Sequence, residues 1–233
     1  VKLNKDSLMI GSMTTHSAVE NSPLIGRHCP ILSETAMTIA DVQVRNRGTI
    51  GGSVCHADPA GDYLAPLVAI DAEFRAINSK RKMRTISADK FFVDIFTTAL
   101  KQDELLTEIR VPKPPSTRYG SAYAKHKYVE GGFAIVGAAA VVSVNKDGTC
   151  DRAKVVLSGV STSPVRVEMI EKEFRGKKLD ERAIEEAGRI VLKAVHEPLS
   201  DIHASADYRR EMAAVFTKRA LRLALARSRK KEA

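Results

Sequence analysis

The sequence of 233 residues predicts an α+β protein built from two domains. Its length exceeds the roughly 100–200 residues of one typical domain. The first half mixes short helix and strand signals, whereas the second half has three strand-like runs followed by helices. A cluster of prolines that ends at Pro115 interrupts the chain between the two halves. We therefore expect one domain over residues 1–115, a second over residues 116–228, and a basic tail over residues 229–233.

The first domain is expected to consist of short elements. Pro30 suits the first turn of a helix, and Asn78-Ser79-Lys80 joins two alternating runs as a hairpin. Ser22-Pro23 is expected to end the helix over residues 17–21, and the polar stretch 42–48 is expected to be irregular. The expected strands are residues 7–10, 73–77, 83–86 and 105–111, and the expected helices are residues 17–21, 31–40, 64–70 and 88–92.

The second domain is expected to be a three-stranded antiparallel sheet with helices. The turn Asn145-Lys146-Asp147-Gly148 favours an antiparallel pair, because Asn, Asp and Gly tolerate positive φ. Met212, Val215 and Phe216 lie near one face of the last helix and predict that this face is buried. The expected strands are residues 120–127, 133–144 and 151–159, and the expected helices are residues 165–174, 180–195 and 206–227.

The charge balance is basic but uneven. Lys and Arg number 37 and Asp and Glu number 28, a difference of nine. Residues 201–233 hold nine basic and four acidic residues, and their end suits a solvated helix terminus, where cations complement the helix dipole. No nucleic-acid motif and no interleaving of Arg with aromatic residues accompanies this charge. The sequence therefore argues against a nucleic-acid-binding module, which would show salt-sensitive binding to DNA.

Hydrophobic runs and cysteines exclude further classes of protein. No apolar run approaches the roughly 18 residues of a membrane span, and the N-terminal residues contain no segment of signal-peptide type. The chain begins at Val1, and we expect that further residues once preceded it. Cys29, Cys55 and Cys150 are far apart and form no C-x-x-C pair, which is typical of free thiols in a reducing cytoplasm.

The most informative stretch opens with Thr49-Ile50-Gly51-Gly52-Ser53. Gly51 and Gly52 lack Cβ atoms, so their backbone can pass close to a bulky group and their N–H groups can face an anion. Thr49 and Ser53 add hydroxyl groups on either side. The set indicates a cradle for a nucleotide cofactor, but on spacing alone a Gly-Gly pair fits a plain tight turn at least as well.

Two carboxylates follow this stretch. Asp58 and Asp62 suit the hydroxyl groups of a sugar or ribityl chain better than they suit phosphates. His56 has no partner at ligand spacing, and we expect it to be structural or to lie close to a cofactor. No residue is predicted to be a catalytic nucleophile or base, and no metal site is predicted.

Six segments of the chain match one known family. They are I-G-S-M-T-T-H at residues 10–16, V-R-N-R-G-T-I-G-G-S at 44–53, H-A-D-P-A-G-D at 56–62, L-T-E-I-R-V-P at 106–112, S-A-Y-A-K-H-K at 121–127 and D-Y-R-R-E-M-A at 207–213. In these segments the sequence resembles the flavoprotein (medium) subunit of carbon monoxide dehydrogenase, xanthine dehydrogenase and related molybdenum hydroxylases. The resemblance covers nearly the whole chain.

The resemblance implies a fold, a cofactor and a site. The first domain would be part of a PCMH-type FAD-binding domain, and the second would be the C-terminal domain of the family, with FAD between them. Residues 49–53 would contact the pyrophosphate and the ribityl chain, and Asp62 would hold a polar group of FAD. Ile39 would lie beside the isoalloxazine ring and Leu106 in its neighbourhood. Lys125, or in its place Lys127, would make a polar contact to the flavin.

The chain departs from the family in one respect. Members of the family carry a second glycine-rich loop, of A-G-G-x-S type, which wraps the diphosphate of FAD, and this loop is not found in the chain. Each charge-assisted hydrogen bond lost with it would cost about 1.5–3 kcal/mol. We therefore expect these residues alone to bind FAD weakly or not at all.

The function implied by the resemblance is electron transfer. An iron–sulfur small subunit would supply electrons to FAD, a quinone or NAD would accept them, and a molybdopterin large subunit would oxidise the substrate. Carbon monoxide, purines, aldehydes and aromatic acyl thioesters all remain open as substrates. The alternative is a cofactor-free scaffold or interaction protein on the same fold. Gly131-Gly132 is expected either to approach the flavin or to form a plain turn.

Overall fold

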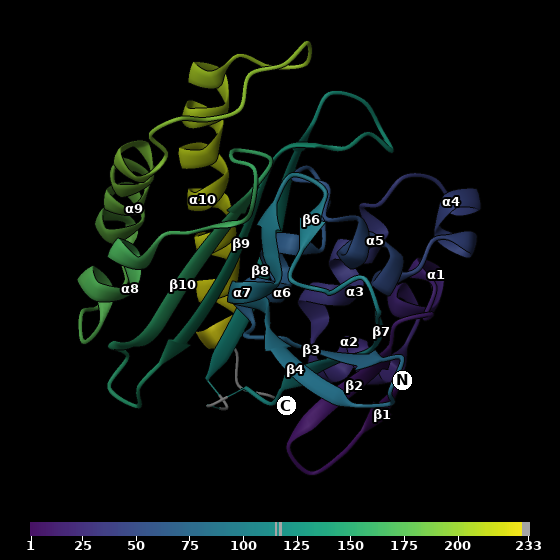
Figure 1. The fold of residues 1–233 in the computed structure, drawn as a ribbon. Coiled ribbons are helices and arrows are strands. Elements are labelled where there is room, and N and C mark those ends of the chain that lie inside the picture. The colour runs from purple at the N-terminus through teal and green to yellow at the C-terminus, as the bar shows by residue number, and fades with distance from the viewer. Residues whose placement is uncertain (115, 117, 230–233) are drawn as a thin grey trace.

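The computed structural model describes residues 1–114, 116 and 118–229. Two antiparallel sheets lie beside each other, and helices surround them (Figure 1). The first sheet and a group of short helices come from the first half of the chain. The second sheet, with three helices beside it, comes from the second half. This arrangement confirms the predicted α+β class.

The first sheet has five strands and is flanked by short helices. Its order is β1 (Lys2–Leu3), β2 (Ser7–Gly11), β7 (Glu104–Pro112), β3 (Glu73–Asn78) and β4 (Met83–Ser87). A separate hairpin joins β5 (Phe92–Asp94) to β6 (Thr97–Thr98). The helices are α1 (His16–Glu20), α2 (Pro23–His28), α3 (Pro30–Met37), α4 (Val42–Arg47), α5 (Ile50–His56), α6 (Leu64–Ala69) and α7 (Ala88–Phe91).

The second sheet has four strands, one more than predicted. Its order is β11 (Val165–Arg166), β10 (Cys150–Ser158), β9 (Ala134–Val144) and β8 (Tyr119–Lys127). The helices that follow are α8 (Glu168–Phe174), α9 (Glu181–Ala194) and α10 (Ala206–Arg229). The additional strand, β11, contains only two residues and replaces the first turn of the helix that we predicted over residues 165–174.

The second sheet separates two hydrophobic cores. Side chains alternate across a strand, and in β9 Ala139 and Val141 belong to the core of the first domain, whereas Ala138 and Ala140 belong to the core beneath α10. Helices α3 and α6 pack against the first face, and α10 packs against the other. Residues of β8 that point toward the first domain can therefore take part in a site between the two halves.

One prediction about the helices was wrong, and the reason is helix capping. Stretch 42–48 is not irregular, because Asp41 accepts a hydrogen bond from Val44 N at 2.9 Å and starts α4. The break at Ser22-Pro23 is confirmed, because α1 ends at Glu20 and a new helix, α2, begins at Pro23. Pro23 occupies the first turn of α2 behind the Ser22 cap, a position where its missing N–H costs nothing.

Some predictions concern residues outside the described part of the chain. Pro115 of the proline cluster and residues 230–233 of the predicted tail belong to this group. The three cysteines are free thiols, with Cys29 and Cys150 buried and Cys55 exposed. Among the described residues, no helix combines the length and the apolar character needed to cross a membrane.

Candidate functional site

The centre of the candidate site is a buried ion pair that joins the two halves of the chain. Asp62 is 6 % exposed, and its Oδ2 accepts a hydrogen bond from Lys125 Nζ at 2.7 Å. Its Oδ1 accepts one from the hydroxyl of Tyr123 at 2.8 Å. The Lys125 side chain is 3 % exposed and also donates to the carbonyl of Thr38 at 2.9 Å. Ile39 follows Thr38 directly in the chain, and its side chain packs against the core of the first half.

Burial dominates the electrostatics of this pair. Burial raises the pKa of Asp62, while the charge of Lys125 and the hydrogen bonds from Lys125 and Tyr123 act in the opposite direction. Burial and the neighbouring Asp62 carboxylate raise the pKa of the Tyr123 hydroxyl well above its ordinary value. Tyr123 therefore keeps its proton at neutral pH and serves as a donor.

The predicted glycine cradle is the start of a helix. Thr49 is the N-cap of α5, and its Oγ1 accepts a hydrogen bond from Gly52 N at 3.0 Å. The other N–H groups of residues 50–53 also have partners inside the chain. Their acceptors are the carbonyls of Thr14, Ser12 and Thr49 for Ile50, Gly51 and Ser53, respectively. The prediction that the amides of Gly51 and Gly52 face an anion is therefore wrong for this structure.

The two glycines meet different surroundings. Gly51 is buried, and a Cβ atom there would lie 2.5 Å from the carbonyl oxygen of Ser12. Gly51 thus permits close approach of the chain to itself rather than to a ligand. Gly52 is exposed and leaves a surface without a side chain, between the half-buried hydroxyl-bearing residues Thr49 and Ser53.

Leu106 belongs to the same group as α5. It is buried in β7, and the carbonyl of the next residue, Thr107, accepts a hydrogen bond from Ser12 N at 3.0 Å. Ser12 in turn contacts Gly51. The predicted residues thus form two groups, one around Ser12 and one around the Asp62–Lys125 pair.

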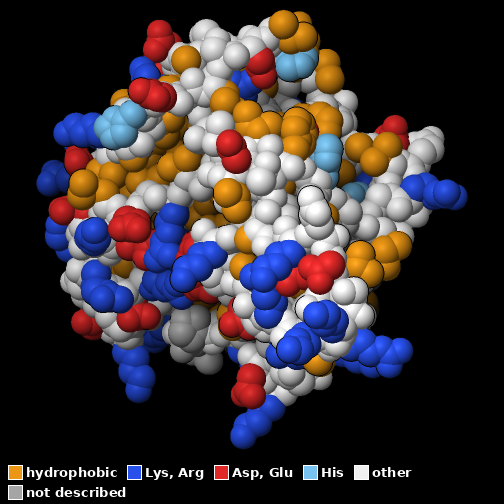
Figure 2. Space-filling model, viewed as in Figure 1, with side chains coloured by type: hydrophobic (Ala, Val, Ile, Leu, Met, Phe, Trp, Pro, Cys, Tyr) orange, Lys and Arg blue, Asp and Glu red, His pale blue; other side chains and the backbone are white. Residues whose placement is uncertain are grey.

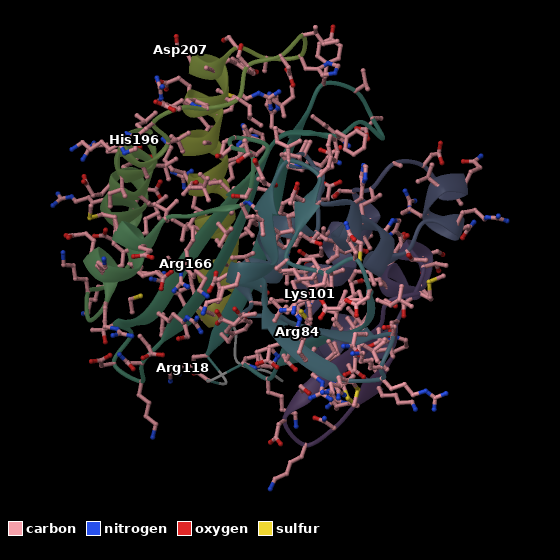
Figure 3. All side chains as sticks on the ribbon, viewed as in Figure 1. Arg84, Lys101, Arg118, Arg166, His196 and Asp207 are labelled. Carbon is pink, nitrogen blue, oxygen red and sulfur yellow. The ribbon has the colours of Figure 1, made fainter. Side chains whose placement is uncertain are left out.

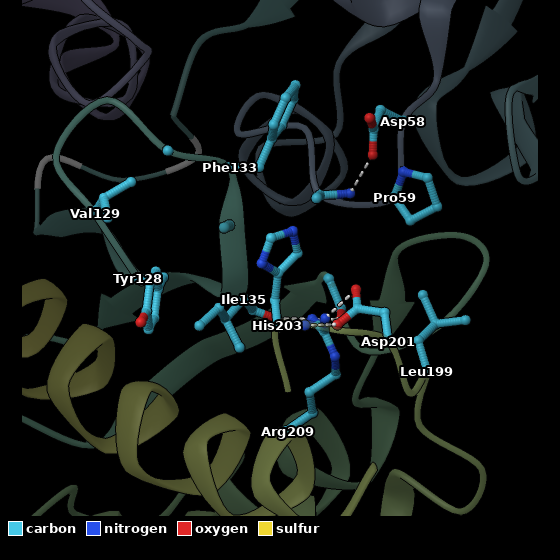
Figure 4. A pocket seen from close by; sticks show the side chains of 14 residues that line it. Asp58, Pro59, Tyr128, Val129, Phe133, Ile135, Leu199, Asp201, His203 and Arg209 are labelled. Carbon is cyan, nitrogen blue, oxygen red and sulfur yellow. Dashed lines mark hydrogen bonds and ion pairs between the residues drawn. The ribbon is translucent and has the colours of Figure 1, made fainter. Parts of the chain in front are cut away.

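Asp58 lines a cleft of about 330 Å³ near the second group (Figure 4). Its Oδ1 accepts a hydrogen bond from Ala60 N at 2.9 Å. The cleft lies between this turn, the loop that joins β8 to β9, and the loop before α10. Its lining residues are Asp58, Pro59, Ala60, Tyr128, Val129, Gly132, Phe133, Ala134, Ile135, Gly159, Leu199, Asp201, His203 and Arg209.

The mouth of the cleft is apolar. Tyr128, Val129 and Phe133 are exposed, although they are large hydrophobic residues. In the view of Figure 2, hydrophobic side chains gather in the upper half of the molecule, and Lys and Arg dominate the lower half. At the floor of the cleft, Arg209 donates to the carbonyls of Ile135 and Gly159.

The structure shows the contacts of the residues named in two alternatives that the sequence left open. Lys125 forms the ion pair with Asp62, whereas Lys127 forms an ion pair with Glu130 in the following loop. Gly131 has a φ of +72° and packs against the backbone of Ala40, with a virtual Cβ 3.4 Å from the carbonyl carbon. The loop with Gly131-Gly132 therefore approaches the segment that contains Ile39.

Sequence reasoning missed Tyr123 and Thr38 in this site. The signal for Tyr123 was present, because residues two apart on a strand point to the same face and Tyr123 lies two before Lys125. No signal in the sequence indicates that a main-chain carbonyl such as that of Thr38 accepts a hydrogen bond from a distant lysine.

Comparison with known proteins places this fold in a flavoprotein class. The family described as "FAD binding domain in molybdopterin dehydrogenase" matches residues 1–114. The family described as "CO dehydrogenase flavoprotein C-terminal domain" matches residues 121–224. The chain belongs to the family of FAD-binding medium subunits of molybdenum hydroxylases.

Named relatives support the same assignment. The carbon monoxide dehydrogenase medium chain of Hydrogenophaga pseudoflava is 36 % identical over 95 % of this chain and 76 % of the relative. The 6-hydroxypseudooxynicotine dehydrogenase complex subunit alpha of Paenarthrobacter nicotinovorans is 33 % identical over 98 % of this chain and 76 % of the relative.

Solved structures agree with the sequence relatives. Carbon monoxide dehydrogenase from Hydrogenophaga pseudoflava superposes with a TM-score of 0.92 at 36 % identity, over 97 % of this chain and 77 % of the solved chain. Quinoline 2-oxidoreductase from Pseudomonas putida 86 gives a TM-score of 0.91 at 28 % identity, over 98 % and 78 % of the two chains. The comparisons favour a flavoprotein over a cofactor-free scaffold.

Proposed function

We propose that this chain binds FAD and transfers electrons within a molybdenum hydroxylase complex. An iron–sulfur small subunit would deliver the electrons, and a quinone or NAD would accept them. A molybdopterin large subunit would oxidise the substrate. Family membership supports this proposal, and so do relatives that are named as the medium chain or as subunits of multi-subunit dehydrogenases.

The observation that carries the proposal is the buried Asp62–Lys125 pair at the junction of the two halves. A charged pair in an apolar interior is costly unless it is fully hydrogen-bonded or serves a ligand. Here both carboxylate oxygens are engaged and Lys125 has two acceptors, so the pair is rigid. An ammonium group has three N–H donors, and Lys125 uses two of them here, so its third donor can serve the polar edge of a flavin.

The donor set suits FAD in its polar and its apolar parts. Asp58, Asp62 and Lys125 would hold hydroxyl and ring polar groups. The hydroxyls of Thr49 and Ser53, with the bare surface at Gly52, would face the pyrophosphate. Ile39 and Leu106 would make apolar contacts. Because the amides of residues 50–53 have partners inside the chain, side chains carry most of the polar contacts proposed here.

The protein residues bind and orient, and the cofactor carries the redox chemistry. When bound, FAD supplies one- and two-electron transfer between the iron–sulfur donor and the acceptor. Lys125 fixes the Asp62 carboxylate and is itself fixed by Thr38. The apolar mouth formed by Tyr128, Val129 and Phe133 would exclude water from the neighbourhood of the ring.

The experiment that tests the proposal is flavin analysis of the native complex. The complex is purified with all its native subunits and is then denatured. The amount of FAD released is compared with the amount of this chain. We expect about one FAD per chain and flavin absorption bands that bleach on anaerobic reduction. A native complex that contains this chain but releases no flavin would contradict the proposal.

A further inference from the structure

Tyr123 occupies an unusual position beside the Asp62–Lys125 pair. Its side chain lies on the face of β8 that points toward the first domain, together with Lys125. Its hydroxyl donates to Asp62 Oδ1 at 2.8 Å, while Lys125 donates to Oδ2 at 2.7 Å. The two oxygens of one carboxylate are thus held by two residues of the same strand. This geometry leaves the carboxylate no freedom to rotate.

The neighbouring strand leaves room for the Tyr123 hydroxyl. Gly137 pairs with Lys125 in the register of β8 and β9. A Cβ atom on Gly137 would lie 2.5 Å from the hydroxyl oxygen of Tyr123 and 2.4 Å from Ser158 Oγ. A glycine inside a buried strand weakens it unless another group needs the space. The absence of a side chain at Gly137 therefore leaves the space that the Tyr123 hydroxyl occupies when it donates to Asp62.

We propose that Tyr123 is a positioning residue of the flavin site. Its hydroxyl holds the Asp62 carboxylate in the orientation in which that carboxylate contacts the cofactor. This inference rests on the proposed function. Tyr123 itself does not touch the cofactor in this proposal. It acts through Asp62, because its hydroxyl donates to that carboxylate and is buried away from the solvent.

The proposal predicts a specific loss in the Y123F variant. Phenylalanine keeps the ring and its packing but removes the donor, so Oδ1 of Asp62 loses its partner. Because a hydrogen bond to a charged group contributes more free energy than one between neutral groups, we expect the dissociation constant of FAD to rise about 5- to 20-fold. The Y119F variant is the matched control, because Tyr119 lies four residues earlier on the same face of β8. The hydrogen bonds to the Asp62 carboxylate come from Tyr123 and Lys125, so Y119F leaves them in place.

The experiment uses the assembled complex, from which FAD is removed and then titrated back while flavin fluorescence is followed. Wild type, Y123F, Y119F, D62A and the D62A/Y123F double variant are compared, and the visible flavin bands are recorded for each. Alanine removes the acceptor of the Tyr123 hydroxyl, which asparagine would keep. If Tyr123 acts through Asp62, Y123F weakens FAD binding in the wild-type background and changes it by less than about twofold in the D62A background. The flavin bands shift in Y123F and not in Y119F.

Each outcome decides the inference. Equal affinities for Y123F and Y119F, or an equal effect of Y123F in both backgrounds, would overturn the role of Tyr123 while leaving the proposed function intact. A wild-type complex that takes up no FAD would overturn both. If Y123F does not assemble, 3-fluorotyrosine at position 123 replaces it, because it keeps the shape and makes the hydroxyl a stronger donor. Unchanged flavin bands with 3-fluorotyrosine would also overturn the inference.

Discussion

At the scale of single residues, the adjacent glycines at the start of α5 have opposite surroundings. We predict that the G51A variant is destabilised by about 2–4 kcal/mol, because its methyl group would overlap the backbone of Ser12 and the chain would have to shift. We predict that G52A changes the free energy of unfolding by less than about 1 kcal/mol, because Gly52 is exposed and alanine favours a helix. Urea unfolding of both variants measures this difference, and equal losses would contradict it.

The sequence did not indicate the structural roles that the residues of this region have. Thr49 and the Gly-Gly pair suggested that amides face an anion, but Thr49 is a helix cap and Gly51 contacts Ser12. A glycine in a sequence shows that space is needed, and it does not show whether a ligand or another part of the chain fills that space. Asp62 and Lys125 were predicted separately, and their pairing depends on contacts between residues 63 positions apart.

At the scale of elements, Arg209 connects the first turn of α10 to the second sheet. Arg209 is 4 % exposed and donates to the carbonyls of Ile135 and Gly159 and to the carboxylate of Asp201. Figure 4 shows the side chain reaching from α10 toward Asp201 at the floor of the cleft. The guanidinium group of Arg209 thus connects α10 to β9, to the turn after β10 and to the loop that precedes α10.

We predict that the R209M variant loses about 3 kcal/mol of stability, because two carbonyls and the Oδ2 atom of Asp201 lose the donor that Arg209 supplies. The loop that precedes α10 should also become more sensitive to limited proteolysis. The matched control is R189M on α9, where Arg189 forms an exposed ion pair with Glu186 at 2.6 Å. Exposed pairs are worth little, so the control should lose less than about 0.5 kcal/mol in thermal or urea unfolding. Similar losses in both variants would show that Arg209 is not a structural tie.

Elements with strong periodicity were predicted well, and short capped helices were not. The hairpin of β3 and β4, the long strands β8 to β10 and the helices α9 and α10 all match their predicted positions within a few residues. Helix α4 was missed because none of its residues is buried, so it shows no apolar stripe. Strand β11 was missed because its two residues are strand only through pairing with β10.

At the scale of the whole molecule, charged side chains join the two halves at the edge of the second sheet. Asp71, which follows α6, pairs with Arg152 and Lys154 of β10. Arg166, labelled in Figure 3, donates to Asp89 of the first half at 3.0 Å and to Glu171 of α8. Lys154 is fully buried, so Asp71 is essential to its neutralisation.

We predict that the D71N variant loses about 2–3 kcal/mol of stability, because the buried Lys154 would lose its counter-ion. The loss is smaller than for a fully enclosed pair, since the Asp71 side chain is 38 % exposed and water screens it. The D71N/K154M double variant should recover most of the loss, because it removes both charges together. Chemical unfolding of wild type, D71N, K154M and the double variant tests this, and a double variant as unstable as the sum of the two single losses would contradict the prediction.

The same carboxylate should make the junction of the two halves sensitive to acid. Burial acts to raise the pKa of Asp71, but Lys154 and Arg152 outweigh burial, so the pKa lies below its ordinary value in the folded protein. A carboxyl group with a lowered pKa stabilises the fold fully above its unfolded pKa of about 4, and this contribution is lost as the pH falls through the folded pKa. The stability difference between wild type and D71N should therefore be constant from about pH 5 to pH 7 and shrink below about pH 4. Urea unfolding at each pH measures it, and a difference that stays the same at pH 3 would show that the Asp71 charge does not hold the two halves together.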